Sequence, residues 1–418
     1  RVTEAEITRN GQPLPFDSLV IDSYIENGQK TFNFASNEFR GSVIGDFSIR
    51  DLPATFTYFL SKYYPAYIQP PARLPKNQSI SFDITTLWVE DYLQLIDTSM
   101  SGLNNSHFYG KLDLGQNELD LHADVPQFKY KQYNFDDVGI AATGNRDSIS
   151  LTGVAKNIRI NDSLNVPLTT FHVMARNDSS RISIQTGANQ KVEKADINAL
   201  VMTYDDGVKI DFDPSTFTVN GKTWSVDNSG ELVLRTNSPA SGQLLLRESN
   251  QEIRLQTVPG KGDWNDLLVE LNNVNLGDFS PYFLPRNRLE GTSTGRITIE
   301  DPVHKFNAKA DLKANGIVLD NDSLGSFSGH IDYDNATGAL TGKGTNLDTA
   351  HRVAFNLALN VKDKEKAKDN HISLSTYRYP VKILERFLSE LFSDLQGFVT
   401  GPIDLNGPLD NISVTGKA

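Results

Sequence analysis

The chain has no cysteine and no long apolar run. The absence of cysteine excludes disulfide frameworks, thiolate metal sites and cysteine nucleophiles. It fits an oxidising compartment, although cytosolic proteins can lack cysteine too. No stretch reaches the roughly 18 consecutive apolar residues that a membrane span requires, and no signal-like segment stands at the start. We therefore expect a piece of a longer protein, whose anchor or targeting segment lies outside this chain.

Positive charge is also scarce. The 418 residues include 40 Lys and Arg against 52 Asp and Glu, which gives a formal net charge of −12. A protein that binds nucleic acid displays a basic face that releases counterions, so we expect no nucleic-acid partner. The chain is 38% hydrophobic and 22% charged, which is typical of a folded protein with a large core.

Motifs for metal or catalytic chemistry are missing. The seven histidines are scattered without metal-ligand spacing, and neither a P-loop nor a nucleophile elbow occurs. Asp320–Gly325 begins like a calcium loop but lacks an oxygen ligand at position 5 and has Ile331 at position 12, which favours a hairpin turn. Carboxylates abound without a distinctive pair, so counting alone leaves a paired-carboxylate glycosidase open. We predict a protein that is not an enzyme and needs no cofactor or metal.

Two polar features have simple structural interpretations. His122 stands between Leu121 and Ala123 at a polar position of an alternating run, so we expect it to be solvated. The charge run at 362–369 (KDKEKAKD) is typical of a solvated loop.

What the chain has in abundance is strict alternation of apolar and polar residues. It is clearest at 119–125 (LDLHADV), 306–312 (FNAKADL) and 355–361 (FNLALNV). A period of two places apolar side chains on one face of a strand and polar ones on the other. Turn pairs such as Asn220-Gly221 separate such runs. We predict a mostly β fold, an antiparallel sheet with one apolar face.

Helical periodicity is rare. Apolar residues recur at helical spacing at 52–63, ahead of Pro65, and again at 384–395; shorter stretches occur at 88–96 and 276–283. We expect an N-terminal β segment over 1–75 that ends in a helix and a connector with Pro70, Pro71 and Pro75. A continuous sheet is expected over 76–418, with helical interruptions near 88–96, 276–283 and 381–395.

A glycine pattern recurs along the chain. Two residues four apart precede two apolar residues, all at even offsets and so on one face of a strand; the copies begin with Gly41 and Gly45, Gly291 and Gly295, Gly397 and Gly401, and more loosely Ser106 and Gly110. Bare patches permit close approach of another element. We predict that neighbouring helices, 384–395 above all, lie across these patches as a cover or gate. A tight strand crossing or bulge is the rival interpretation, and a coincidence of common strand glycines remains open.

The same segments carry a family resemblance. The stretches at 224–257, 286–312 (RNRLEGTSTGRITIEDPVHKFNAKADL), 318–346 and 391–418 (LFSDLQGFVTGPIDLNGPLDNISVTGKA) look like the TamB family of translocation and assembly modules, within the AsmA-like group of the diderm bacterial envelope. The resemblance is clearest over about 200–418 and extends more faintly to 39–53 (FRGSVIGDFSIRDLP).

The resemblance implies an elongated, twisted antiparallel sheet bent into a taco-like groove with an apolar interior. Such proteins are anchored in the inner membrane, span the periplasm and conduct phospholipids to the outer membrane. They also support outer-membrane protein assembly with an Omp85-type partner, which the parent protein would contact through regions outside this chain. The residues expected to line the groove and hold acyl chains are Ile297, Ile299, Phe306, Ala308, Ala310, Leu312, Phe355, Leu357, Leu359, Ile403 and Leu405.

Alternation alone allows a second class of protein. A sheet with one apolar face buries that face against a second sheet or around an apolar ligand. The alternative to the lipid groove is therefore a β-solenoid or sandwich that acts as an adhesin-like or glycan-binding module.

Overall fold

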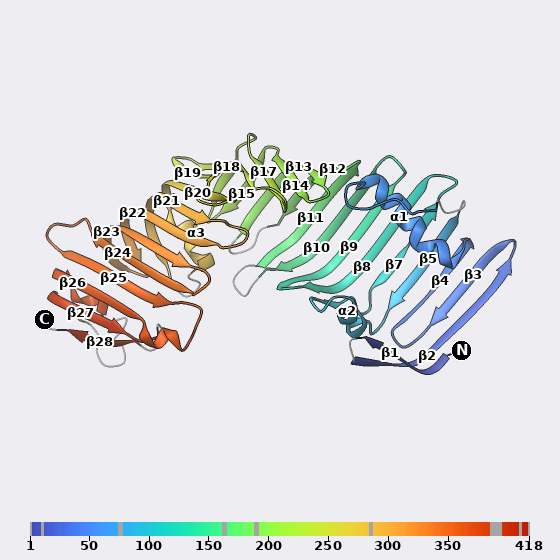
Figure 1. The fold of residues 1–418 in the computed structure, drawn as a ribbon, viewed down its shortest axis with the longest axis horizontal. Coiled ribbons are helices and arrows are strands. Elements are labelled where there is room, and N and C mark those ends of the chain that lie inside the picture. Colours follow the sequence, from blue (N-terminus) through green and yellow to red (C-terminus); the bar gives the residue numbers. More distant parts are fainter. Residues whose placement is uncertain are drawn as a thin grey trace. The chain divides into compact units, whose positions relative to one another are not determined.

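The computed structural model describes residues 2–9, 12–73, 78–160, 165–187, 192–283, 287–384, 395–408 and 412–416. Contacts divide the chain into two compact units, Arg1–Thr223 and Trp224–Ala418, and each is considered by itself. Figure 1 traces both units, in which antiparallel strands dominate and helices are few and short. The predicted fold class, a mostly β chain of antiparallel sheet, is confirmed.

The N-terminal unit is a meander in which most strands pair with the next one in the sequence. The exceptions include β5, which pairs with β7, β6, which pairs with β8, and β13, which pairs with both β14 and β15. Its strands are β1 (Val2–Arg9), β2 (Gln12–Glu26), β3 (Gln29–Ala35), β4 (Phe39–Asp46), β5 (Ser79–Thr86), β6 (Met100–Gly102), β7 (His107–Asp113), β8 (Glu118–Tyr130), β9 (Tyr133–Gly144), β10 (Ile149–Arg159), β11 (Asn165–Arg176), β12 (Ser179–Thr186), β13 (Val192–Tyr204), β14 (Gly207–Phe212) and β15 (Ser215–Val219).

The helix α1 (Leu52–Tyr63) follows a short 3₁₀ turn, η1 (Ile49–Asp51), and lies over one end of this sheet (Figure 1). Its apolar stripe buries Phe59 and Tyr63, which are 1% and 0% exposed, against β-strand residues such as Leu112. The Tyr63 hydroxyl donates to the carbonyl of Asn145 at 2.6 Å, and burial raises the pKa of Tyr63 to about 12. The helix therefore crosses the apolar face of several strands, and a partly buried hydrogen bond holds its C-terminal end.

The C-terminal unit is a second meander. From β18 onward each strand pairs with its successor in the chain. Its strands are β16 (Lys222–Val226, which begins at the junction), β17 (Glu231–Arg235), β18 (Ser241–Glu248), β19 (Gln251–Pro259), β20 (Asn265–Asn275), β21 (Leu289–Glu300), β22 (Asn307–Leu319), β23 (Asp322–Asp334), β24 (Ala339–Asn346), β25 (Arg352–Asn360), β26 (His371–Pro380), β27 (Phe398–Asn406) and β28 (Ser413–Gly416).

The sheet of this unit is a single layer. Among its described residues, the principal strand–strand contacts join hydrogen-bonded neighbours, and no second sheet of the unit lies over it. The helical segments among the described residues of this unit are α3 (Leu276–Phe283), η2 (Lys366–Asp369) and η3 (Val381–Leu384). Trp224 is fully buried and packs edge-on against Phe279 of α3 at 5.4 Å. Small helical pieces thus cover only parts of the sheet.

Three of the four predicted helices are found where the periodicity placed them. The segments at 52–63, 88–96 and 276–283 form α1, α2 (Glu90–Ile96) and α3. Of the fourth, 381–384 forms η3, and residues 385–394 lie outside the described part of the chain. None of the described helices is long and apolar enough to cross a membrane.

The connector at Pro70 and Pro71 does not interrupt the sheet. Strands β4 and β5, on either side of it, pair along their full length, and the division into compact units falls at 223/224 rather than near residue 75. The suspected calcium loop is the hairpin turn between β22 and β23, with Asp320 in a left-handed conformation. Among the described residues, no group of three acidic, His or Cys side chains is placed to hold a metal ion.

Candidate functional site

The strand register aligns apolar residues across the C-terminal unit. Residues directly opposite each other in an antiparallel pair lie on the same face. From β20 to β28, one such row is Val269, Ile297, Ala310, Ile331, Gly342, Leu357, Ile372, Leu405 and Val414. At about 4.8 Å between strands this row spans about 38 Å. We call this side of the sheet the apolar face.

Two flanking rows extend the apolar face along the strands. One contains Leu267, Ile299, Ala308, Tyr333, Leu340 and Leu359, and the other contains Leu271, Gly295, Leu312, Gly329, Gly344, Phe355, Leu374 and Ile403. Ile403 and Leu405 are 5% and 4% exposed, whereas Ile297, Ala310 and Leu357 are only half-buried. Much of the apolar face therefore keeps partial access to solvent.

The opposite side, the polar face, carries charge. Arg296, Asp311, His330, Lys343 and Asn356 form the row between the apolar ones. The His330 ring contacts the carboxylates of Asp311 and Asp332, each at 2.7 Å. Hydrogen bonds to Asp311 first, and then to Asp332, raise the pKa of His330. The two faces are thus chemically distinct, as the alternation predicts.

At one end of the strands, the last residues of β26 and the 3₁₀ turn η3 cover part of the apolar face. The Tyr379 hydroxyl donates to the carbonyl of Leu324 in β23 at 3.1 Å, and Lys382 pairs with Asp322 at 3.1 Å. Val381 and Phe327 each pack against a buried cluster that includes Ile403. Burial raises the pKa of Tyr379 to about 12. This segment turns back across the ends of the strands from β26 toward β23.

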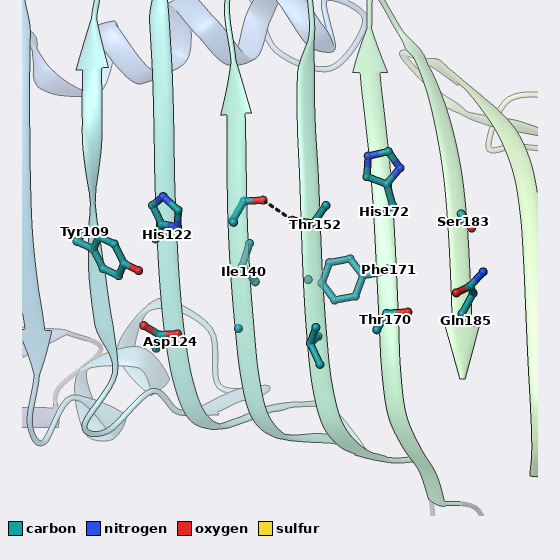
Figure 2. Close-up of a pocket in the computed structure, with 14 residues that line it drawn as sticks. Tyr109, His122, Asp124, Ile140, Thr152, Thr170, Phe171, His172, Ser183 and Gln185 are labelled. Atoms are coloured by element: carbon teal, nitrogen blue, oxygen red, sulfur yellow. Dashed lines mark hydrogen bonds between the residues drawn. The ribbon is translucent and has the colours of Figure 1, made fainter. Parts of the chain in front are cut away.

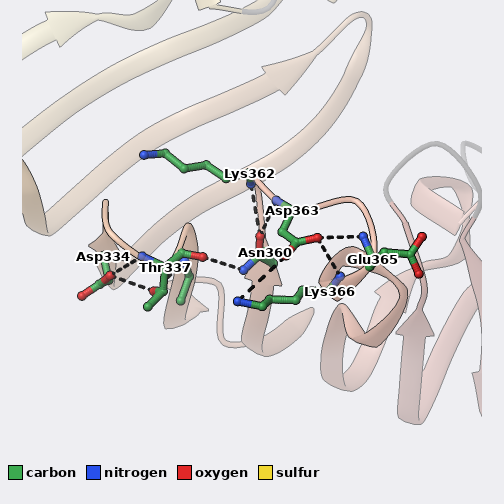
Figure 3. A network of polar contacts seen from close by, with 8 residues as sticks. Asp334, Thr337, Asn360, Lys362, Asp363, Glu365 and Lys366 are labelled. Carbon is green, nitrogen blue, oxygen red and sulfur yellow. Dashed lines mark hydrogen bonds and ion pairs between the residues drawn. The ribbon is translucent and has the colours of Figure 1, made fainter.

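At the opposite end of the strands, a polar network links the turn between β23 and β24 with the loop that follows β25, as Figure 3 shows. Asn360 donates to the carbonyl of Thr337 at 2.9 Å and accepts from the backbone of Asp363 at 2.8 Å. The Lys362 ammonium donates to the carbonyl and side-chain oxygens of Asn335, each at 2.6 Å. The charge run at 362–369 is therefore an exposed loop, as expected, but hydrogen bonds tie it to the β23–β24 turn.

Several of the repeated glycines face the backbone of a paired strand, whereas a Cβ at Gly397 would have no atom within 4 Å. A Cβ at Gly45, Gly110 or Gly295 would lie 1.9, 2.2 or 2.1 Å from a carbonyl oxygen of the paired strand. Gly45, Gly295 and Gly401 also have φ values of 145°, 152° and 139°, which disfavour other residues. At Gly45, Gly110 and Gly295 the contacts fit the rival interpretation, a tight strand crossing. The gate formed by 384–395 stays a prediction, because most of that segment lies outside the described residues.

Other glycines of the apolar face lie beneath phenylalanine rings. A Cβ at Gly344 would lie 2.6 Å from the ring of Phe355 on the neighbouring strand. In the N-terminal unit the Phe171 ring stands over Gly153 in the same way, 2.1 Å from a Cβ there. Because glycine has no side chain, the phenylalanine ring can lie flat against the backbone of the neighbouring strand.

The predicted lining residues share one face, with one exception. Those of β21, β22, β25 and β27 occupy the three apolar rows, whereas Asn307, Lys309, Asp311 and Asp404 alternate with them. Phe306 precedes β22, has a φ of 58° and is 48% exposed, so it departs from the strand pattern. Its place in the groove lining stays a prediction, and the strand begins at Asn307, one residue later than the sequence indicates.

Sequence reasoning missed several members of the apolar face. Ile331, Tyr333, Ile372 and Leu374 complete the rows on β23 and β26. Their alternation (HIDY at 330–333 and HISL at 371–374) is visible in the sequence. Glycine and serine interrupt the runs around these residues, which weakens the signal.

The N-terminal unit has an apolar face of its own. The row Phe32, Val43, Phe82, Gly110, Leu121, Ala142, Leu151, Val173, Ile182 and Ala199 crosses β3 to β13. Helix α1 covers one end of this face through Phe59 and Tyr63. The two units therefore share the arrangement of an apolar sheet face with helical cover at a strand end.

The polar face of the N-terminal unit has a shallow hollow of about 660 Å³, shown in Figure 2. Gly139, Ala141 and Thr152 contribute a low floor on β9 and β10. Taller side chains line it on β7 and β8 (Tyr109, His122 and Asp124) and on β11 and β12 (Thr170, His172, Ser183 and Gln185). The hollow offers hydroxyl, imidazole, amide and carboxylate groups to a polar ligand.

His122 is less solvated than predicted. Its ring stacks on Tyr109 at 4.7 Å with an interplanar angle of 7°, and its Nε2 contacts Asp120 at 3.0 Å. Tyr109 stacks in turn on His107 at 4.7 Å. Tyr109 on the paired strand and Asp120 on the same strand therefore take the place of part of the solvent around His122.

Comparisons of the chain with protein-family models, with curated proteins and with solved structures give no match.

Proposed function

We propose that this chain is the periplasmic part of a TamB/AsmA-like protein that carries phospholipids along an apolar β-sheet face. In this proposal it connects the inner and outer membranes and supports outer-membrane biogenesis, including outer-membrane protein assembly. The parent protein is anchored in the inner membrane, and an Omp85-type protein is its outer-membrane partner; both contacts lie outside this chain. The role is that of a conduit, with no catalysis.

The carrying observation is the apolar face of the C-terminal unit. Its central row crosses nine strands without a charged side chain. Single-layer packing leaves Ile297, Ala310 and Leu357 half-exposed. An apolar band of this extent exceeds what scattered surface residues produce, and each acyl methylene buried on it contributes about 0.8 kcal/mol. Acyl chains are ligands that match such a surface.

Site-specific photocrosslinking tests the proposal. A photoreactive phenylalanine analogue placed at Leu357 faces the apolar row, whereas the same residue at Asn356 faces the polar side of the same strand. In the full-length protein in cells, we expect crosslinks to phospholipid from position 357 and none from position 356. Ile297 and Arg296 provide a second matched pair on β21.

Two results would contradict the proposal. Equal lipid crosslinking from both members of a pair would show non-specific contact with membranes. Absence of lipid at 357 and 297, together with absence of phospholipid in mass spectra of the denatured purified protein, would remove the lipid role.

A second candidate function is supported by the hollow of the N-terminal unit. A binding module for a polar ligand such as a glycan would use the hydroxyl, amide and imidazole groups around Gly139. Gly139→Gln would fill the floor, because a Cβ there meets only the Asp124 carboxylate at 3.9 Å. Glycan-array binding that is lost in this variant, without lipid crosslinking at 357, would favour the binding-module function.

A further inference from the structure

A group of cationic and aromatic side chains lies at one end of the strands of the C-terminal sheet, where β25 begins and β26 ends. We call it the rim cluster, defined as His351, Arg352, Tyr377, Arg378 and Phe398. The Arg352 guanidinium lies 4.8 Å from the centre of the Tyr377 ring, and that of Arg378 lies 5.7 Å from the Phe398 ring. The His351 ring stacks on Phe398 at 5.0 Å.

The local backbone builds the rim cluster on the polar side. Val353 and Val399 belong to the buried cluster of the apolar face, so their neighbours Arg352 and Phe398 point the other way. Tyr377 is directly opposite Arg352 in the β25–β26 pair. A register shift between Thr376 and Tyr379 and a φ of 48° at Arg378 mark a bulge, and bulges re-aim side chains at sheet edges.

No carboxylate of the described residues neutralises the two arginines of the rim cluster. Within the described residues, neither Arg352 nor Arg378 forms an ion pair, whereas Arg247 and Arg296 each contact a carboxylate. In the part of the chain that the structure describes, the rim cluster contacts one carboxylate, that of Asp348, through His351 at 3.3 Å. Two guanidinium groups without a carboxylate partner among the described residues, in a chain of net charge −12, form a local site for an anion, and guanidinium matches phosphate geometry.

The aromatic rings are unusually exposed. Tyr377 is 46% and Phe398 is 57% exposed, and Leu347 in the preceding turn is 43% exposed. A dissolved anion gains nothing from such rings, whereas aromatic side chains favour the interfacial region of a bilayer. Basic and aromatic groups together therefore fit a lipid head group better than free phosphate.

We propose that the rim cluster binds the phosphate of an anionic phospholipid at the membrane surface, with its aromatic rings among the head groups. The inference rests on the proposed function, since it assigns the polar part of the same ligand class to a site at the edge of the sheet whose other face holds acyl chains.

The test is flotation of the full chain with vesicles. Vesicles of phosphatidylglycerol and phosphatidylethanolamine are compared with vesicles of phosphatidylcholine. We expect binding to the anionic vesicles, weakened about 30-fold in the double variant Arg352→Gln/Arg378→Gln, because each basic residue near an anionic surface contributes a factor of about five. The matched control, Arg247→Gln/Arg296→Gln, removes the same charge from ion-paired arginines and is expected to bind within about twofold of the wild type.

Further measurements distinguish the phosphate of a lipid head group from free inorganic phosphate. Tyr377→Ser/Phe398→Ser is expected to weaken vesicle binding, and millimolar inorganic phosphate is expected to compete no better than chloride at equal ionic strength. Normal vesicle binding by this aromatic variant, with strong competition by phosphate, would show a free-phosphate site and overturn the inference. Equal losses in the two arginine double variants would also overturn it, because they would indicate general electrostatics.

The outcomes separate this inference from the proposed function. Lipid crosslinking at Leu357 reports the apolar face, and we expect it to persist in Arg352→Gln/Arg378→Gln. Loss of vesicle binding with intact crosslinking supports the rim cluster as a separate head-group site. Specific vesicle binding without any crosslinking would support the head-group site at the rim cluster and contradict the proposed acyl-chain conduit. Thermal melts within about 2 °C of the wild type are expected, because these substitutions are at exposed side chains.

Discussion

Replacing Gly295 with alanine tests why the repeated glycines are present. Gly295 has a φ of 152°, and a Cβ would lie 2.1 Å from the Asp311 carbonyl oxygen and 2.9 Å from the Leu312 Cα. Both contacts are with backbone, so the strand pair must shift. Strain of this kind costs about 1–3 kcal/mol, and a weakened ladder hydrogen bond adds about 0.5–1.5 kcal/mol.

Gly295→Ala should therefore lower the free energy of unfolding by about 2–4 kcal/mol. For a unit of roughly 200 residues this corresponds to a melting temperature lower by about 5–15 °C. Calorimetry or circular dichroism measures the shift. Gly262→Ala is the matched control, because a Cβ there has no atom within 4 Å; its melting temperature should stay level or rise slightly.

Equal melting temperatures for Gly295→Ala and Gly262→Ala would refute the strand-crossing explanation. The same logic applies to Gly401, whose φ is 139°. If 384–395 forms a gate over this position, Gly401→Val should reduce lipid retention per folded molecule while the melting temperature holds. If Gly401 serves the strand crossing, stability falls first.

Three further predictions concern other contacts. Phe59→Ala in α1 should lower the free energy of unfolding by about 3–5 kcal/mol, whereas Leu60→Ala, at a side chain that is 42% exposed, should cost less than about 1 kcal/mol; denaturant titration compares the two, and equal losses would contradict the packing of the helix. The His330 pKa is raised above 6.5 by carboxylate neighbours, so its contribution to stability is complete below pH 6.5 and disappears as the pH rises through the folded-state pKa. NMR titration should show this pKa fall in Asp311→Asn, and an unchanged value would contradict the assignment. Asn360→Ala removes the hydrogen bonds that join the loop after β25 to Thr337 and should cost about 1–2 kcal/mol, with faster amide exchange in that loop; unchanged exchange would show that the network does not restrain it.

Alternation in the sequence determined much of the fold. The runs at 119–125, 307–312 and 355–360 have a period of two over enough residues to specify both the strand and the face that each side chain occupies. Apolar spacing with a following proline likewise located α1. These signals are local, because each depends on residues within one strand or one helix.

Strand register was decided only by the tertiary structure. Ile297, Ala310 and Leu357 belong to one row because β21 to β25 pair without a slip at these positions. Phe306 shows the limit of the pattern: its parity matches that of Ala308, but a left-handed backbone takes it out of the strand. The rim cluster depends in the same way on a bulge in β26, and it joins residues about 20 to 47 positions apart.

The glycine repeats show both levels at once. Sequence spacing established that Gly291, Gly295 and the apolar residues after them share a face, whereas the contact that requires glycine comes from Asp311 on the next strand. A single strand carries no information about how closely its neighbour approaches, since that distance depends on twist and register across the pair. Local pattern thus specified the faces of this protein, and strand pairing decided what each face brings together.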